Sequence, residues 1–182
     1  MEFAAKYAEK EEFNQYWYSQ HTIQYLAKEI LHQRPKSVAF LSTPSLFYAC
    51  EELLVATSDS IELVLFDFDP ALPRVVHYDF HDPVNFAASF QQHFDFVVID
   101  PPFITEEVWT KYTTSAQFLL AAQGKLLLTT IAENHSMMQR LLKCSLQRFQ
   151  PSIPHLVYQY GTYANYPSDA LNVLNPEIPQ DE

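Results

Sequence analysis

Asp100, Pro101, Pro102 and Phe103 stand together in this 182-residue sequence and combine the groups that chemistry on an amine requires. The two prolines follow an apolar run and fix the backbone, so the Asp100 carboxylate and the Pro101 carbonyl are expected to face a cleft. Two fixed acceptors can hold an NH2 group with its lone pair aimed at an electrophile. The ring of Phe103 can stack on a flipped base or attract a cationic amine. The alternative is a strand that simply ends at two prolines, with Asp100 as its cap.

Apolar β-rich runs alternate with helical periodicities around this motif, which predicts an α/β fold. We expect a doubly wound, mostly parallel sheet of seven strands with helices on both faces. The last two strands have no helix between them and are expected to pair antiparallel. The predicted strands cover 37–41, 61–66, 74–78, 94–99, 125–130, 144–149 and 156–166. The predicted helices cover 11–33, 44–57, 84–92, 105–122 and 133–143.

Polar side chains follow the predicted parallel strands at the edge where a doubly wound sheet binds its ligand. In strand order they are Ser42, Thr43, Pro44 and Ser45, then Asp67 and Asp69, then Asp79, then Asp100. Because the carboxyl ends of parallel strands share one edge, the sequence predicts a single site built from these residues.

The charge and composition of the chain limit its partners. The formal net charge is −11, so the overall field repels nucleic acid and attracts a basic protein. No apolar run is long enough to cross a membrane, and the first residues lack the apolar core of a secretory signal. Cys50 and Cys144 form no paired framework and are expected to be buried thiols in a reducing compartment. These features predict a cytoplasmic protein without a membrane partner.

The predicted domain covers residues 13–166. We expect a flexible N-terminus at 1–12 and an acidic C-terminal tail at 167–182. His77, Asp79 and His81 alternate and could share a strand face, which suggests a metal site. No fourth ligand follows at a usual spacing, so we predict no metal.

The motif at Asp100 resembles the D/N/S-P-P-Y/F motif of amino-methyltransferases, which methylate exocyclic or side-chain nitrogens. Other segments are similar to one family, first labelled probable N6-adenine methyltransferases and now grouped as elongation factor 1-alpha lysine N-methyltransferases. These segments are Gln15-Tyr16-Trp17-Tyr18-Ser19, Leu41-Ser42-Thr43-Pro44-Ser45, Phe66-Asp67-Phe68-Asp69, Tyr78-Asp79-Phe80 with Pro83, the run 94–103 that ends in Asp100-Pro101-Pro102-Phe103, Thr105-Glu106-Glu107, and Tyr163-Ala164-Asn165-Tyr166. The similarity spans residues 13–166 and implies a Rossmann-like class I methyltransferase fold.

The resemblance implies S-adenosylmethionine as the cofactor and S-adenosylhomocysteine as the product. General methyltransferases place a glycine-rich loop after the first strand, but this chain has only two glycines, and neither is there. The family also uses a serine and proline loop at this point. The hydroxyls of Ser42, Thr43 and Ser45, with the helix that Pro44 opens, are then suited to the methionine carboxylate.

The remaining cofactor groups would meet carboxylates. Asp67 or Asp69 can accept the ribose hydroxyls; the sequence does not decide between them, and Asp69 is preferred. Asp79 is suited to the adenine amine, and Asp100 borders both cofactor and target.

Aromatic residues are expected to shape the target channel. Trp17 and Tyr18 could cover the cofactor or the target, although such a stripe at helical spacing is also typical of a core. Phe103 and Tyr166 could desolvate a lysine that must lose its proton before attack.

Three functions are therefore considered. The first is methylation of a protein lysine, with elongation factor 1-alpha as the substrate that the resemblance implies. The second is N6-adenine methylation of DNA or RNA, which the same motif would serve and which the net charge disfavours. The third is a methyltransferase fold that acts as a scaffold without catalysis, which only the missing glycines support.

Overall fold

Two buried parallel strands lie at the centre of the structure, a computed structural model that describes residues 2–180. They are β1 (Ser37–Leu41) and β4 (Phe94–Ile99), and both have the predicted bounds. All five residues of β1 are buried, as expected for a strand covered on both faces. The pair runs in register from Val38 opposite Phe96 to Leu41 opposite Ile99.

The sheet has seven strands in the order β3-β2-β1-β4-β5-β7-β6. The others are β2 (Glu62–Asp67), β3 (Val75–His77), β5 (Leu120–Ile131), β6 (Ser145–Leu146) and β7 (Tyr160–Ala164). The first five strands are parallel, β7 is antiparallel to β5, and β6 is antiparallel to β7. The predicted fold class is confirmed, although β6 and β7 are shorter than the segments 144–149 and 156–166.

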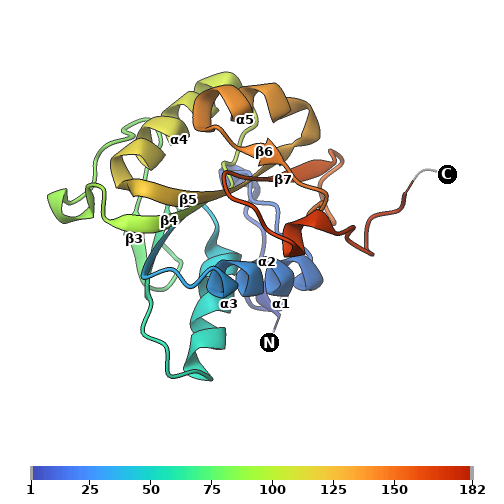
Figure 1. Cartoon of the computed structure of the whole chain (residues 1–182), viewed down its shortest axis with the longest axis horizontal. Coiled ribbons are helices and arrows are strands. Elements are labelled where there is room, and N and C mark those ends of the chain that lie inside the picture. The colour runs from blue at the N-terminus through green and yellow to red at the C-terminus, as the bar shows by residue number, and fades with distance from the viewer. Residues whose placement is uncertain (1, 181–182) are drawn as a thin grey trace.

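Helices cover both faces of this sheet (Figure 1). On one face lie α2 (Gln20–His32) and α3 (Pro44–Val55), and on the other lie α4 (Glu106–Leu119) and α5 (His135–Leu142). Alternate residues of each strand enter two separate hydrophobic cores: Val38 and Phe40 face α2 and α3, whereas Ala39 and Leu41 face α4.

One predicted helix, 11–33, is wrong over its first half. A 3-10 turn, η1 (Glu11–Phe13), ends at Asn14 in the left-handed conformation, and residues 15–19 have no regular secondary structure. The side chain of Ser19 accepts a hydrogen bond from the backbone N–H of Thr22 and starts α2. The aromatic residues of this region are therefore spaced along an irregular segment and not along a helix.

Two further boundaries differ from the prediction. In place of a helix at 84–92 there is only the 3-10 turn η2 (Ala88–Phe90), because Phe86 and Phe90 reach the ring of Phe66 edge-on from turns. Helix α4 ends at Leu119, before the predicted end at Ala122, and β5 begins at once with an irregularity near Gly124.

Both terminal segments expected to be tails contact the domain. Phe3, in the short helix α1 (Phe3–Lys6), is buried against Trp17 with ring centroids 4.8 Å apart. Leu171 is fully buried, and Ser19 donates a hydrogen bond of 2.6 Å to Glu177. Met1 and residues 181–182, the outermost parts of these segments, lie outside the described residues. Among residues 2–180, no helix is long and apolar enough to span a bilayer.

The two glycines should respond differently to alanine. A Cβ at Gly124 would lie 2.9 Å from the backbone oxygen of Ala121, which cannot move aside, so Gly124→Ala should destabilise by about 1–3 kcal/mol. At Gly161 the new methyl meets the tip of the exposed Leu146 side chain, which can rotate away. Urea denaturation of Gly124→Ala, with Gly161→Ala as the matched control, measures this difference. Equal midpoints for the two variants would contradict the packing of β5.

Candidate active site

The ends of β1, β2 and β4 meet where the strand order reverses. The backbone N–H of Asp100 donates to the carbonyl of Leu41 at 3.2 Å, and the N–H of Ser42 donates to the carbonyl of Phe66 at 2.9 Å. Consecutive ladder bonds therefore bring the residues after β1, β2 and β4 to one edge. This edge is where a doubly wound sheet binds a ligand.

Asp100 is half-buried as a residue, but its carboxyl is desolvated and lies close to two hydroxyl groups. Burial raises the pKa of its carboxyl to about 7, and the negative charge of Asp67 acts in the same direction. Hydrogen bonding by Thr129 and Tyr18 opposes this rise. The hydroxyls of Tyr18 and Thr129 also lie 2.6 Å apart. Asp100 therefore changes its protonation near neutral pH, which suits a group that accepts a proton.

The loop after β1 has the backbone of a glycine loop without the glycine. Ser42 has φ of 59°, in the left-handed region that glycine favours, and its Oγ lies 2.7 Å from the hydroxyl of Tyr112. Thr43 is buried, and its Oγ1 has no hydrogen-bond partner among residues 2–180. A buried hydroxyl without a partner next to a helix start is a polar position that a ligand can satisfy. Pro44 opens α3, as predicted.

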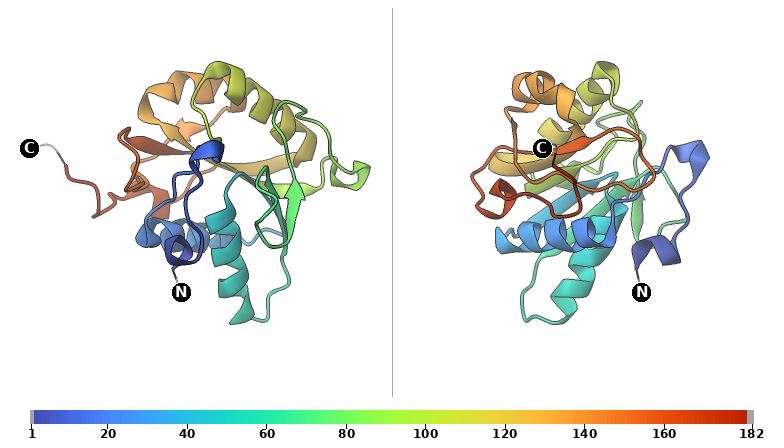
Figure 2. Two further views of the ribbon diagram at one scale, coloured as in Figure 1. Left: turned by 180° about the vertical axis from the view of Figure 1, so that it is seen from behind. Right: turned by 90° about the vertical axis from the view of Figure 1, so that its right-hand side faces the viewer.

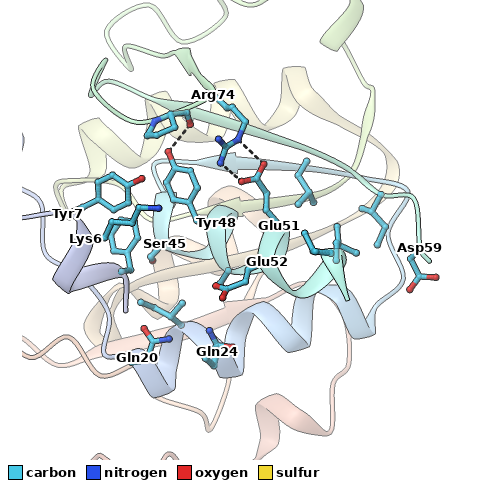
Figure 3. Close-up of a pocket in the computed structure, with 18 of the residues that line it drawn as sticks. Lys6, Tyr7, Gln20, Gln24, Ser45, Tyr48, Glu51, Glu52, Asp59 and Arg74 are labelled. Carbon is cyan, nitrogen blue, oxygen red and sulfur yellow. Dashed lines mark hydrogen bonds and ion pairs between the residues drawn. The ribbon is translucent and has the colours of Figure 1, made fainter. Parts of the chain in front are cut away.

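Ser45 faces another part of the protein. It lines a cavity of about 890 Å³ between α1, α2 and α3, together with residues such as Lys6, Tyr48 and Arg74 (Figure 3). In this cavity the hydroxyl of Tyr48 donates to the carbonyl of Pro73 at 2.7 Å. The expectation that Ser45 joins Ser42 and Thr43 at the strand ends is therefore corrected, because one further residue along the helix turns its side chain toward α2.

The two aspartates after β2 have different partners. The carboxylate of Asp69 accepts hydrogen bonds from Lys10 at 2.9 Å, Gln15 at 3.0 Å and the backbone N–H of Ala71 at 3.0 Å. The carboxylate of Asp67 is held by backbone N–H groups of its own turn, including that of Asp69 at 2.9 Å. Burial raises the pKa of Asp67 to about 6. Because the carboxylate oxygens of Asp69 already accept hydrogen bonds from side chains of the N-terminal segment, Asp67 is the better acceptor for a ligand.

Two predicted site residues are partly exposed at the surface near this edge. Asp79 is near the surface and accepts hydrogen bonds from the backbone and ring of His81, which hold its pKa below the usual range. Phe103 is 47% exposed and meets Phe80 edge-on at 6.4 Å. Phe103 ends the turn formed by Asp100, Pro101, Pro102 and Phe103, called here the DPPF turn, and its exposed ring can contact a partner molecule.

Trp17 and Tyr166 do not reach the site. The indole N–H of Trp17 donates to the carbonyl of Tyr7 at 3.0 Å, and its ring packs in the core on the α2 and α3 face. Tyr166 follows β7 and packs on Phe96, near the start of β4. Because β7 runs antiparallel, its carboxyl end lies at the edge opposite to Asp100.

Several residues near Asp100 were not predicted from the sequence. Tyr160 begins β7, and burial raises the pKa of its hydroxyl, to which the charge of Asp100 adds. The antiparallel direction of this strand was predicted and could have identified Tyr160, since the start of such a strand shares an edge with the ends of its parallel neighbours. Thr129 and Tyr112 carry no distinctive sequence signal. Asn14 was missed because its segment was expected to be helical.

A family model described as "Probable N6-adenine methyltransferase" matches residues 9–168, most of the chain. The chain belongs to this family. A relative in zebrafish (Danio rerio), "EEF1A lysine methyltransferase 1", is 34% identical over 169 residues, which cover 87% of this chain and 99% of the relative. "Protein-lysine N-methyltransferase EFM5" of Saccharomyces cerevisiae is 27% identical over 92% of this chain and 68% of its own length.

The fold of the family member is that of known methyltransferases. A crystal structure of 1,6-didemethyltoxoflavin-N1-methyltransferase from Burkholderia thailandensis, with bound 1,6-didemethyltoxoflavin and S-adenosylhomocysteine, is similar with a TM-score of 0.53. Its sequence is 11% identical, and the match covers 78% of this chain and 76% of that chain. At this identity the likeness establishes the Rossmann-like methyltransferase fold.

The raised pKa of Asp67 predicts a pH-dependent gain in stability for Asp67→Asn. The pKa of Asp67 is about 6 in the folded state and 3.8 as its ordinary value, so the free energy of unfolding falls as the pH rises from about 4 to about 6. Above this range the buried carboxyl is charged in the folded protein. The amide avoids this cost, so the variant should be more stable than the wild type by roughly 1–3 kcal/mol at pH 7.5. The difference should disappear near pH 4.

Urea denaturation at the two pH values measures the effect of Asp67→Asn. The exposed Asp59 provides the control, since Asp59→Asn should leave both midpoints unchanged. A destabilised Asp67→Asn at pH 7.5 would contradict burial as the dominant influence on this carboxyl.

Proposed function

We propose that this protein is an S-adenosylmethionine-dependent N-methyltransferase that methylates a lysine side chain of elongation factor 1-alpha. The observation that carries the proposal is Asp100, a desolvated carboxyl with a pKa of about 7 that lies at the strand-order reversal and precedes an exposed phenylalanine. The names of the relatives in zebrafish and yeast support a protein lysine as the target.

The residues around the edge fit the cofactor. The buried hydroxyl of Thr43, without a partner among residues 2–180, and the N-terminus of α3 offer donors to a carboxylate, and the left-handed backbone of Ser42 makes the turn that a glycine usually makes at this point. Asp67, at the end of β2, offers acceptors to ribose hydroxyls. The cofactor supplies an electrophilic methyl group.

Asp100 and Phe103 would hold the target amine. The ring of Phe103 can attract the charged lysine side chain at the surface. The lysine must lose a proton before it can react, and a carboxylate with a pKa of about 7 accepts a proton far more readily than one with the ordinary value of 3.8. The carboxylate and a backbone carbonyl of the DPPF turn then fix the direction of the nitrogen lone pair.

The charge of the chain favours a protein substrate over nucleic acid. A net charge of −11 opposes the phosphate contacts that dominate nucleic-acid binding, and it attracts a basic surface. The same amine-holding geometry could serve adenine, so nucleic-acid substrates form the second arm of the test.

Transfer of label from S-adenosylmethionine to unmodified elongation factor 1-alpha tests the proposal. The wild type should label the protein on lysine, and Asp100→Ala should lower kcat by at least about 100-fold, because the amine loses its acceptor. Asp59→Ala, at an exposed carboxylate of the opposite edge, is the matched control and should retain full activity.

Two results would overturn this assignment. Label in adenine of DNA or RNA, with none in the protein, would move the activity to nucleic acid. Full activity of Asp100→Ala would remove the DPPF turn from the site.

The two aspartates after β2 should differ in cofactor affinity. Asp67→Ala should weaken S-adenosylmethionine binding by about 10-fold or more, since a charged hydrogen bond contributes about 1.5–3 kcal/mol. Asp69→Ala should have a smaller effect, because its carboxylate is already held by Lys10 and Gln15. Isothermal titration calorimetry measures both dissociation constants. The reverse order of effects would assign the ribose to Asp69.

A further inference from the structure

Residues 10–18 form a strap across the carboxyl edge of the sheet. The strap rises from the N-terminal helix and crosses in front of the strand ends (Figure 2). It is held at β2 by the pair of Lys10 and Asp69 at 2.9 Å, and the rings of Phe13 and Phe68 meet edge-on at 5.5 Å. It therefore covers the edge that carries Asp67 and Asp100.

Asn14 links the strap to the DPPF turn. Its φ is 52°, and its side-chain Nδ2 donates a hydrogen bond to the carbonyl of Pro102. Asparagine tolerates the left-handed conformation better than most residues, so one residue both turns the strap and places an amide donor on the motif. Because this bond uses the carbonyl of Pro102, the Asp100 side chain and the Pro101 carbonyl can still bind other partners.

Tyr18 links the end of the strap to Asp100. Tyr18 is 4% exposed, and its hydroxyl lies 2.6 Å from that of Thr129 on β5. Thr129 follows Leu128, which pairs with Ile99, so Thr129 is the neighbour of Asp100 across the sheet, and hydrogen bonding by both hydroxyls lowers the pKa of the Asp100 carboxyl. The carboxyl thus faces one hydroxyl from the strap and one from the sheet.

We propose that the strap is part of the active site, with Asn14 and Tyr18 as positioning residues: Asn14 holds the DPPF turn through Pro102, and Tyr18 with Thr129 holds the side chain of Asp100. The proposal rests on the proposed function, since it concerns the groups that position the amine. Prolines fix φ but leave the rotation of the turn as a whole and the Asp100 side-chain torsions free. An error of about 1 Å in the acceptors costs on the order of 100-fold in rate, so these contacts affect the reaction.

The groups that are electrostatically coupled to Asp100 come from several elements. They are Tyr18 from the strap, Asp67 from β2, Thr129 from β5, Tyr160 from β7 and Tyr112 from α4. The hydrogen bond from Tyr18 lowers the pKa of Asp100, whereas burial and Asp67 raise it. Loss of the Tyr18 hydroxyl should therefore raise this pKa further.

Substitutions at Asn14 separate its backbone conformation from its hydrogen bond. Asn14→Gly keeps the left-handed turn and removes the donor, while Asn14→Asp keeps the shape and places a carboxylate against the Pro102 carbonyl. We expect kcat on the protein substrate to fall by about 10-fold for glycine and further for aspartate, with KM nearly unchanged. Gln123→Gly is the matched control, since Gln123 is an exposed amide residue with φ of 60°.

If Asn14 only shaped the backbone of the strap, the kcat values of its variants would follow a different order. In that case Asn14→Gly and Asn14→Asp would both match the wild type, and the assignment of Asn14 would be overturned. Circular dichroism and melting temperature verify that each variant folds.

The assignment of Tyr18 is tested by titration of Asp100. Carbon-13 NMR of the carboxyl should report a pKa higher by about 0.5–1 unit in Tyr18→Phe and in Thr129→Val, and Thr129→Ser should restore the wild-type value. The acidic limb of the kcat/KM profile should move to higher pH by the same amount. The control is Thr162→Val, at the position paired with Thr129, whose hydroxyl has no partner among residues 2–180.

Failure of this inference differs from failure of the proposed function. An unchanged Asp100 titration in Tyr18→Phe and Thr129→Val overturns the positioning role, whether or not the enzyme is active. A wild type that binds no S-adenosylmethionine and methylates nothing overturns the proposed function, and the NMR titration still decides whether the strap holds Asp100.

Discussion

Parallel pairing of β1 with β4, from Val38 opposite Phe96 to Leu41 opposite Ile99, places the next residue of each strand at the same edge. The chain leaves the two strands toward opposite faces of the sheet, into α3 and α4. Side chains of neighbouring strands and helices then converge on the edge that carries Ser42 and Asp100. The desolvation of Asp100 and Asp67, and the strap that covers them, all follow from this one pairing.

Three aspartates gather at this edge with one lysine among them. Asp69 forms an ion pair with Lys10, whereas within residues 2–180 Asp67 and Asp100 form no ion pair and have raised pKa values. Folding therefore works against these two carboxylates at neutral pH, a cost commonly found where a site is prepared for a ligand. The same charge and burial that weaken the folded state give Asp100 a proton affinity matched to amine chemistry.

Elements with strong local patterns could be predicted from the sequence. The bounds of β1 and β4 were correct because continuous β-branched and aromatic runs leave little choice of structure. Residues after these strands were located because parallel strands share an edge. Trp17 was misplaced and Asn14 was missed because the aromatic spacing of this irregular segment resembles that of a helix. The pairing of Asp69 with Lys10 could not be predicted because the two residues are distant in sequence. Tyr166 was misplaced because the antiparallel direction of β7, although predicted, was not used to decide at which edge of the sheet the end of this strand lies.

The strain of the left-handed conformation at Ser42 is related to the conformational entropy of the unfolded chain. Seven residues other than glycine have positive φ in the described structure, and each costs the folded state on the order of 1 kcal/mol relative to glycine. A chain with two glycines and twelve prolines, however, has fewer backbone conformations to lose when it folds. Local strain in the native turns is thus offset by a denatured ensemble of low entropy, and a ligand loop without glycine is stiff before any ligand arrives.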